Sequence, residues 1–87
     1  MYKIVYQKET VKFLRKLSPN QLQKIKGKME MLANNPFGDS QNLTALKGLN
    51  DGYRLRIGNL RVIYEVNNKV KSITVWKIGF RGSVYKM

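Results

Sequence analysis

Arginines that alternate with apolar residues across residues 53–65 are the side chains in this sequence best suited to chemistry. Alternation of this kind predicts strands with two unlike faces. The Gly58-Asn59 pair between the two runs predicts a hairpin turn, because both residues tolerate a positive φ. Arg54, Arg56 and Arg61 then share the face opposite to the apolar set. Guanidinium groups on one patch repel each other unless an anion lies among them, and a phosphate backbone is the natural candidate.

A plainer interpretation makes these arginines a solvated sheet face. A lone basic residue on a strand would favour that interpretation. Three converging arginines in so basic a chain favour an anion-binding site.

The charge of the chain points the same way. Its 87 residues predict a single domain over residues 1–87. The 17 lysines and arginines against 5 aspartates and glutamates give a net charge of +12. Such an imbalance favours a polyanionic or acidic partner. Nucleic acid, a ribosome, an anionic membrane and an acidic protein all fit this description.

The composition also disfavours several classes of site. The chain has no cysteine and no histidine, so disulfides and the usual zinc ligands are excluded. The five carboxylates are spread along the chain. We therefore expect no metal site, no cofactor and no paired-carboxylate chemistry. The sequence has no long apolar run and no signal-peptide pattern, so we expect a cytoplasmic protein with no membrane partner.

The elements that must position the arginines follow from local patterns. Residues 1–7 alternate as in a strand, and residues 8–17 show helical spacing. A second helix is expected to begin at Pro19, because Ser18 and Gln21 form a capping box around it, and to end before Pro36.

The second half of the chain predicts a meander of three strands. Residues 37–52 are rich in turn formers and predict a loop. After the hairpin of residues 53–66, residues 70–78 form a third strand with apolar residues on both parities, which is typical of a central strand or a bulge. The expected fold is an α+β domain of order β-α-α-β-β-β. Its antiparallel-rich, four-stranded sheet includes the first strand and carries two N-terminal helices on one face.

Residues outside the hairpin could join the basic face. Arg81 follows the last strand, and Tyr85 lies four residues further on. Lys47 could add a charge, although a single loop lysine is more often solvated. RNA carries its own nucleophile, the 2′-hydroxyl, so an enzyme need only align it, stabilise charge and move protons. Arginine suits the second need, and tyrosine can carry a proton or stack on a base.

These residues resemble a known family. Leu46-Lys47-Gly48, the run at 53–66 and the segment Ile78-Gly79-Phe80-Arg81-Gly82-Ser83-Val84-Tyr85 are similar to those of the RelE/ParE superfamily of bacterial type II toxins, specifically its RelE-like mRNA interferase branch. The similarity covers essentially the whole chain. It implies a metal-free endoribonuclease that cleaves mRNA in the ribosomal A site, leaves a 2′,3′-cyclic phosphate and is neutralised by a cognate antitoxin.

The resemblance also implies roles for individual residues. Arg61 matches the arginine that stabilises the transition-state phosphate, and Arg81 matches the one that assists the leaving group. Tyr85 matches the tyrosine that stacks on or activates the nucleotide. The expected catalytic residues are therefore Arg61, Arg81 and Tyr85, and the expected nucleic-acid contacts are Arg54, Arg56, Lys47 and Phe80.

Two departures from the pattern bear on the mechanism. Arg54 and Arg56 stand where RelE has lysines, and an arginine can hardly be tuned into a base. Phe80 stands where many relatives have histidine, so that position can only pack or stack. If Arg54 and Arg56 occupy the positions that supply the base, we expect slow cleavage or use of Tyr85.

Two rival functions remain at this point. A ParE-type protein on the same scaffold would inhibit DNA gyrase and cleave no RNA. A basic module could also bind nucleic acid without cleaving it.

Overall fold

The computed structural model of the protein describes residues 1–36, 43–45 and 52–80. In chain order, its elements are β1 (Lys3–Tyr6), α1 (Lys8–Arg15), α2 (Pro19–Asn34), β2 (Leu43–Ala45), β3 (Gly52–Ile57), β4 (Leu60–Asn67) and β5 (Ser72–Phe80). The strands form one sheet in the order β1-β5-β4-β3-β2. Only β1 and β5 run parallel.

The predicted α+β class is confirmed, and so is the joining of the first strand to the meander. The sheet has one more strand than we predicted. The three residues of β2 pair with β3 inside the segment that was expected to be a loop. Backbone pairing with an existing edge forms this strand, and a segment rich in turn residues gives little periodicity from which to predict it.

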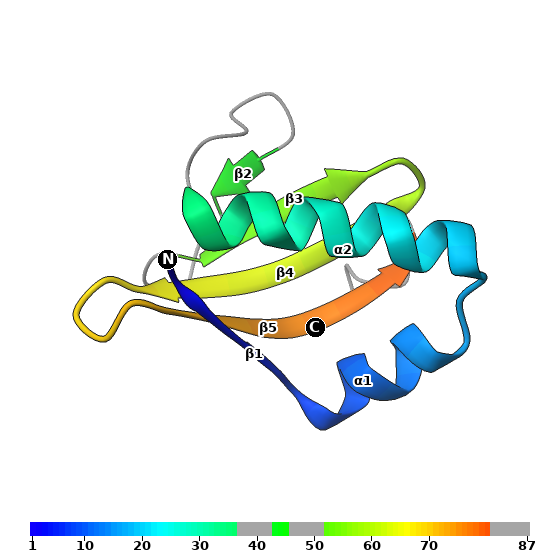
Figure 1. Ribbon diagram of the computed structural model, residues 1–87, viewed down its shortest axis with the longest axis horizontal. Coiled ribbons are helices and arrows are strands. Elements are labelled where there is room, and N and C mark those ends of the chain that lie inside the picture. The colour runs from blue at the N-terminus through cyan, green and yellow to red at the C-terminus, as the bar shows by residue number, and fades with distance from the viewer. Residues whose placement is uncertain (37–42, 46–51, 81–87) are drawn as a thin grey trace.

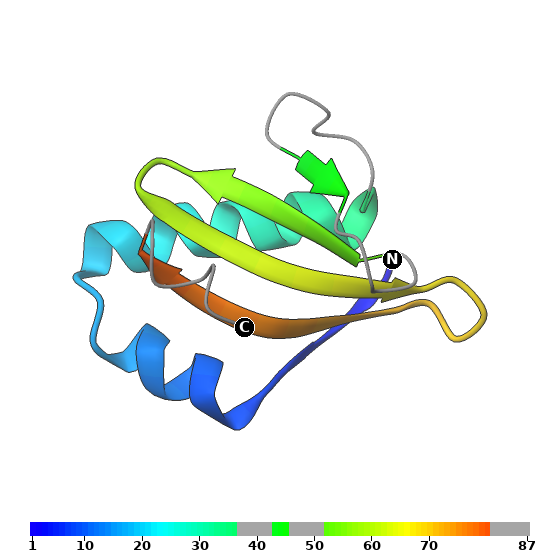
Figure 2. The ribbon, with the colours of Figure 1, turned by 180° about the vertical axis from the view of Figure 1, so that it is seen from behind.

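Both helices lie on the same side of the sheet. Helix α2 runs across β3 and β4, and α1 lies beside β5 (Figure 1). From behind, the strands face the viewer, α2 lies beyond them, and α1 lies to one side of β5 (Figure 2). One apolar core joins the two layers and includes Ile25 and Met29 of α2 and Leu55 and Val62 of the sheet.

The start of α2 is set by its cap. Ser18 Oγ accepts a hydrogen bond from the backbone N–H of Gln21, and the Gln21 side chain accepts one from the N–H of Ser18. This is the predicted capping box, which satisfies N–H groups that have no partner within the helix. Pro19 takes the first helical position, where its missing N–H costs nothing. The cap fixes where α2 begins over the core.

The β3–β4 turn fixes the register of the hairpin. Gly58 has a φ of +59°, and the φ of Asn59 is negative. A positive φ at the first central residue alone is the pattern of a type II′ turn. The register then pairs Leu55 with Val62 and Arg56 with Arg61. The predicted division of the hairpin into an apolar and a basic face follows from this pairing.

A bulge in β5 explains its mixed pattern. Ile63 pairs with Lys77 and Tyr64 pairs with Val75, so Trp76 is the extra residue between them. The bulge shifts the alternation, because Val75 is buried before it and Ile78 after it. Lys77 is thereby kept out of the core.

The N-terminal strand is held at both ends of its course. The backbone N–H groups of Tyr2 and Lys3 donate to the carbonyls of Ala33 and Lys71, and the Tyr2 hydroxyl donates to Asn68 Oδ1 at 2.6 Å. Further along, Tyr6 packs against the core. Burial raises the pKa of the Tyr6 phenol above its ordinary value of 10.0.

Candidate nucleic-acid interface

Two cross-strand rows bring the basic residues of the sheet together. The first row runs from Arg54 through Ile63 to Lys77, and the second runs from Arg56 through Arg61 to Gly79. Paired residues on neighbouring strands project to the same side of a sheet. We call the surface formed by Arg54, Arg56, Arg61 and Lys77 the cationic face. It lies opposite to the helices, on the side turned toward the viewer in Figure 2.

Arg61 is the most buried member of the cationic face, with only 8% of its surface exposed. Its Nη1 donates to the carbonyl oxygens of Gly58 and Leu60, both at 2.8 Å. These bonds tie the guanidinium to the hairpin turn. The N–H groups on Nε and Nη2 carry no hydrogen bond to any residue in the described ranges. They form one edge of a planar fork that fits two oxygens of a phosphate.

Part of the cationic face is shielded from solvent. Ile63 is only 4% exposed although it lies between Arg54 and Lys77. Arg56 is exposed, and Arg54 is partly exposed. The cationic face therefore combines one fixed, buried guanidinium with side chains that reach further into solvent.

Like charges lie directly opposite each other in this face. Arg56 and Arg61 are cross-strand partners, and such a pair is destabilising when nothing offsets it. The Arg61 guanidinium is partly compensated by the two turn carbonyls. An anion on the face would offset more of the repulsion.

Sequence reasoning missed Lys77. An unbroken alternation would have given it the same face as core residues, because Val75 is buried two positions earlier. The bulge at Trp76 places it with Arg54 instead. The signal available in the sequence was the change of parity between Val75 and Ile78, but that pattern fits a central strand as well as a bulge and so does not place the residue between them.

Phe80 is not brought to the cationic face. It pairs with Leu60, a core residue, and its ring lies edge-on to that of Phe13 with 5.5 Å between the centroids. Of the two roles that the sequence left open at this position, the described contacts are those of packing. Lys47, Arg81 and Tyr85 lie outside the described residues.

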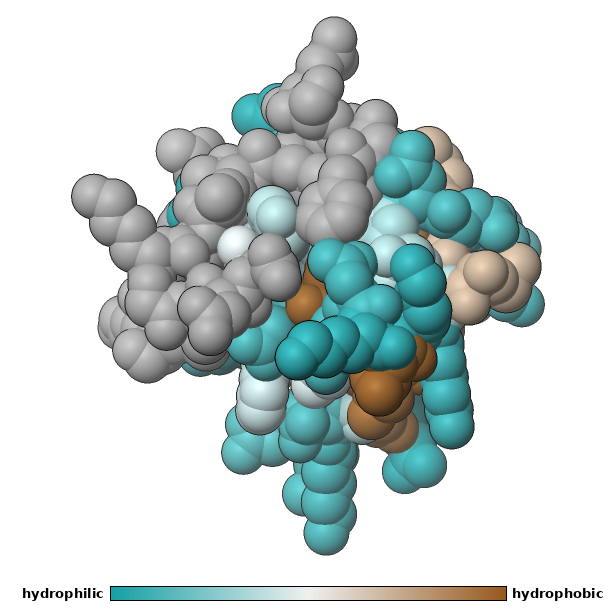
Figure 3. Space-filling model, turned by 90° about the vertical axis from the view of Figure 1, so that its left-hand side faces the viewer, coloured by the Kyte–Doolittle hydropathy of each residue, from teal (hydrophilic) through white to brown (hydrophobic). Residues whose placement is uncertain are grey.

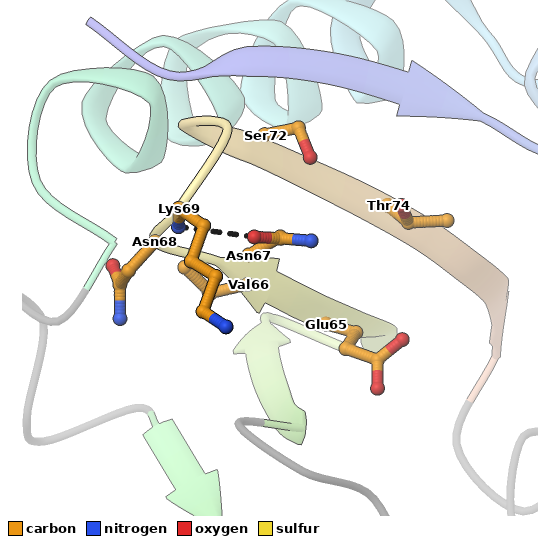
Figure 4. A pocket seen from close by; sticks show the side chains of 7 residues that line it. All are labelled: Glu65, Val66, Asn67, Asn68, Lys69, Ser72 and Thr74. Atoms are coloured by element: carbon orange, nitrogen blue, oxygen red, sulfur yellow. Dashed lines mark hydrogen bonds between the residues drawn. The ribbon is translucent and has the colours of Figure 1, made fainter.

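A polar hollow of about 520 Å³ lies further along the sheet, at the β4–β5 turn (Figure 4). One of its side chains, that of Asn67, is bonded to the turn itself. Asn67 Oδ1 accepts from the backbone N–H groups of Lys69 and Val70, at 3.0 and 3.3 Å. Viewed from this end, the described surface is mainly hydrophilic and is interrupted by separate hydrophobic areas (Figure 3). The two hydrogen bonds that Asn67 Oδ1 accepts show that this side chain stabilises the turn.

Among the described residues, no three histidine, cysteine, aspartate or glutamate side chains are grouped closely enough to share a metal. No helix in the described ranges is long and apolar enough to cross a bilayer.

Comparison with known proteins identifies the family. Residues 4–85 match the family described as ParE toxin of type II toxin-antitoxin system, parDE. The chain belongs to this toxin family. The toxin is 35% identical over 86 residues to RelE1 of Methanocaldococcus jannaschii, a match that covers 98% of this chain and 96% of RelE1.

Solved structures share the fold. The toxin is similar to a chain of the archaeal RelE–RelB complex from Pyrococcus horikoshii, with a TM-score of 0.80, 31% identity, and coverage of 93% of the toxin and 96% of that chain. A chain of the intact E. coli RelBE toxin-antitoxin complex is also similar, with a TM-score of 0.77 and 24% identity. The match covers 92% of the toxin and 96% of that chain, and at this identity it supports the fold alone. The Methanocaldococcus jannaschii relative is named RelE1, and the Pyrococcus horikoshii structure is of a RelE–RelB complex. The toxin is therefore RelE-like and belongs to the RelE/ParE superfamily of type II toxins.

Proposed function

We propose that this toxin is a ribosome-dependent endoribonuclease that cleaves mRNA in the A site without a metal ion. The observation that carries the proposal is the register of β3 and β4, which gathers Arg54, Arg56 and Arg61 on one face. Kinship with RelE proteins supports the same function. The charge of +12 suits docking onto ribosomal RNA.

The chemistry is an internal transfer at phosphorus. The 2′-oxygen of one nucleotide attacks the adjacent phosphorus, the bond from phosphorus to the 5′-oxygen breaks, and a 2′,3′-cyclic phosphate and a 5′-hydroxyl form. Negative charge grows on the non-bridging oxygens as the bond forms. The Nε and Nη2 donors of Arg61 are held in place by the turn carbonyls, so they meet this charge without reorganising.

The remaining roles follow the resemblance. Arg54 and Arg56 seat the RNA backbone on either side of the scissile phosphate. Arg81 assists the departing 5′-oxygen, and Tyr85 stacks on the base or carries a proton. Arginine has a pKa above about 12 and gives up no proton at neutral pH, so proton transfer falls to Tyr85 or to the RNA and ribosome.

An antitoxin is part of the same proposal. The RelE proteins of Pyrococcus horikoshii and Methanococcus jannaschii were each solved in complex with RelB. We propose that a cognate antitoxin binds this toxin in the cytoplasm and masks its basic surface. Copurification of the toxin with the product of the adjacent gene tests this point, and a toxin that always purifies alone would contradict it.

The test of the activity is A-site cleavage. Ribosomes programmed with a defined mRNA are incubated with the toxin, and the products are mapped by primer extension. The wild type should cut in the A site. Arg61→Lys keeps the charge but loses the fork, and we expect its cleavage rate to fall about 10²–10³-fold, as for loss of one transition-state donor. Arg81→Ala should fall comparably, whereas Lys24→Ala, an exposed lysine on α2, should cleave as the wild type does.

One observation favours a second function. The matching family is described as ParE toxin, and the resemblance associates ParE-type proteins with inhibition of DNA gyrase. A folded toxin that leaves programmed mRNA intact but blocks supercoiling by gyrase would replace the nuclease proposal with this one.

A further inference from the structure

A basic hollow lies between α1 and β5, next to the cationic face. Its volume is about 240 Å³, and its lining includes Glu9, Lys12, Phe13, Lys16, Trp76 and Lys77. Helix α1 stands beside the part of β5 that extends beyond its pairing with β1, which ends at Val75. The resemblance assigns no role to α1 or to Trp76.

Trp76 is both exposed and oriented. It is the extra residue of the β5 bulge, and bulges redirect side chains. Its indole N–H donates to the Glu65 carboxylate at 3.3 Å, which limits rotation of the ring. Even so, 42% of the residue stays exposed. A large aromatic ring held in position at the surface is a ready stacking platform.

Three lysines and one glutamate line the hollow, and the Glu65 carboxylate accepts the hydrogen bond from the indole N–H. Lys12 lies in the last turn of α1, and Lys16 is the C-cap residue four positions later. Both line the hollow, where their like charges repel. Lys77 adds a third ammonium group from the sheet. Glu9 is the one carboxylate among the residues that line this hollow. The balance favours an anionic ligand.

We propose that this hollow binds an unpaired nucleotide of RNA, with its base on Trp76 and its phosphate among Lys12, Lys16 and Lys77. An aromatic ring beside cations is the combination that holds single strands, because every base has a face to stack and a phosphate to neutralise. A base within a duplex has no free face. Stacking on Trp76 therefore favours unpaired RNA.

Lys77 links this site to the cationic face. It lines the hollow, and it also lies in the row of Arg54 and Ile63. One RNA strand can therefore pass from the cationic face to the hollow without leaving positive charge. This inference rests on the proposed action on RNA, and it names where the strand is held next to the site of cleavage.

The chain offers a direct probe, because Trp76 is its only tryptophan. A short, unstructured oligoadenylate is titrated into the full-length toxin while tryptophan fluorescence is recorded. Stacking predicts saturable quenching. The same phosphate concentration in duplex RNA should quench far less, and equal quenching by the duplex would overturn the proposal.

Two matched double variants distinguish binding in the hollow from attraction to the overall positive charge. Lys12→Gln/Lys16→Gln should raise the Kd about tenfold, through loss of phosphate contacts. Lys3→Gln/Lys24→Gln changes the net charge equally at two exposed sites away from the hollow and should change the Kd less than about threefold. Equal weakening of both variants would mean diffuse electrostatic attraction and overturn the site.

The ring is tested with a labelled oligoadenylate and fluorescence anisotropy. Trp76→Leu should weaken binding about tenfold or more, whereas Trp76→Phe keeps an aromatic face and should restore most of the affinity. Thermal unfolding of each variant checks that it is folded. Equal affinity of the two variants would overturn the stacking role.

The outcome is separable from the nuclease proposal. Ribosomal cleavage without quenching of Trp76 would overturn the hollow and leave the nuclease in place. Quenching with the expected variant pattern, but without cleavage, would leave the binding site in place and overturn the nuclease.

Discussion

Alternating residues of β3, β4 and β5 form two unlike faces, one buried against the helices and one that carries positive charge. Leu55 and Val62, which pair on the helix side, are at most 1% exposed. Arg56 and Arg61, one position along on each strand, form a like-charge pair on the other side. The first pair gains free energy from burial, and the second loses some to repulsion. Stability and the proposed function are therefore separable between neighbouring residues of one strand.

Replacing Leu55 by alanine should produce the largest effect on the helix side. The side chain is 1% exposed, so truncation leaves a cavity in the core. We expect the free energy of unfolding to fall by about 2–5 kcal/mol, measured by urea denaturation. A loss below about 1 kcal/mol would mean that this face is less tightly packed than its burial indicates.

Tyr64 joins the core to the segment after α2. Its hydroxyl donates to the carbonyl of Pro36 at 3.0 Å, and its ring lies 5.8 Å from that of Tyr53. Tyr64→Phe keeps the ring and removes the hydrogen bond, so the free energy of unfolding should fall by about 1–2 kcal/mol. Thermal and urea denaturation measure it. An unchanged stability would show that another donor, such as water, replaces the hydroxyl.

Gly58 sets the turn that assigns residues to the two faces. No atom lies within 4 Å of the position that a Cβ would take, so the cost of Gly58→Ala comes from its φ of +59° alone. We expect a loss of about 1 kcal/mol. Gly27→Ala is the matched control, because Gly27 also has open space around it but lies inside α2. That variant should be about 0.5–1 kcal/mol more stable than the wild type.

On the cationic face, Arg56→Gln should barely change stability. It removes an exposed charge opposite Arg61, so the free energy of unfolding should stay within about 0.5 kcal/mol of the wild type. Binding to ribosomes should weaken, and its dependence on salt should flatten by about one phosphate contact. A large loss of stability would contradict the division between the two faces.

The smallest expected effect concerns Tyr6, which packs against the core from β1. Burial raises the pKa of its phenol above 10.0, so the folded state holds this proton more tightly than the unfolded state. The protonated Tyr6 phenol therefore contributes fully to the free energy of unfolding below pH 10, and this contribution is lost as the pH rises through the pKa of the folded state. Unfolding free energies recorded from pH 9 to pH 11 should fall more steeply for the wild type than for Tyr6→Phe, and parallel curves would contradict this.

Local patterns predicted the elements on which the site is built. The capping box at Ser18 gave the start of α2, and the alternation around Gly58 gave both the hairpin and the shared face of its three arginines. These features depend on residues that are close in sequence. For that reason they can be derived without knowing the rest of the fold.

The rest depends on contacts between distant segments. The short strand β2 exists because an edge of β3 is available to it. The place of Lys77 depends on how β5 pairs with β4, and the burial of Arg61 depends on the turn carbonyls that its guanidinium reaches. No periodicity within a single segment encodes these features.

The parallel pairing of β1 with β5 determines when the sheet can form during synthesis. Residues 3–6 leave the ribosome well before their partners in the sheet, residues 72–75, have been made. Pairing over so long a separation is slow to form and cannot begin before the last strand is made. Lys77 belongs to that same strand. A ribosome that is making this toxin therefore carries no finished cationic face until β5 has been translated.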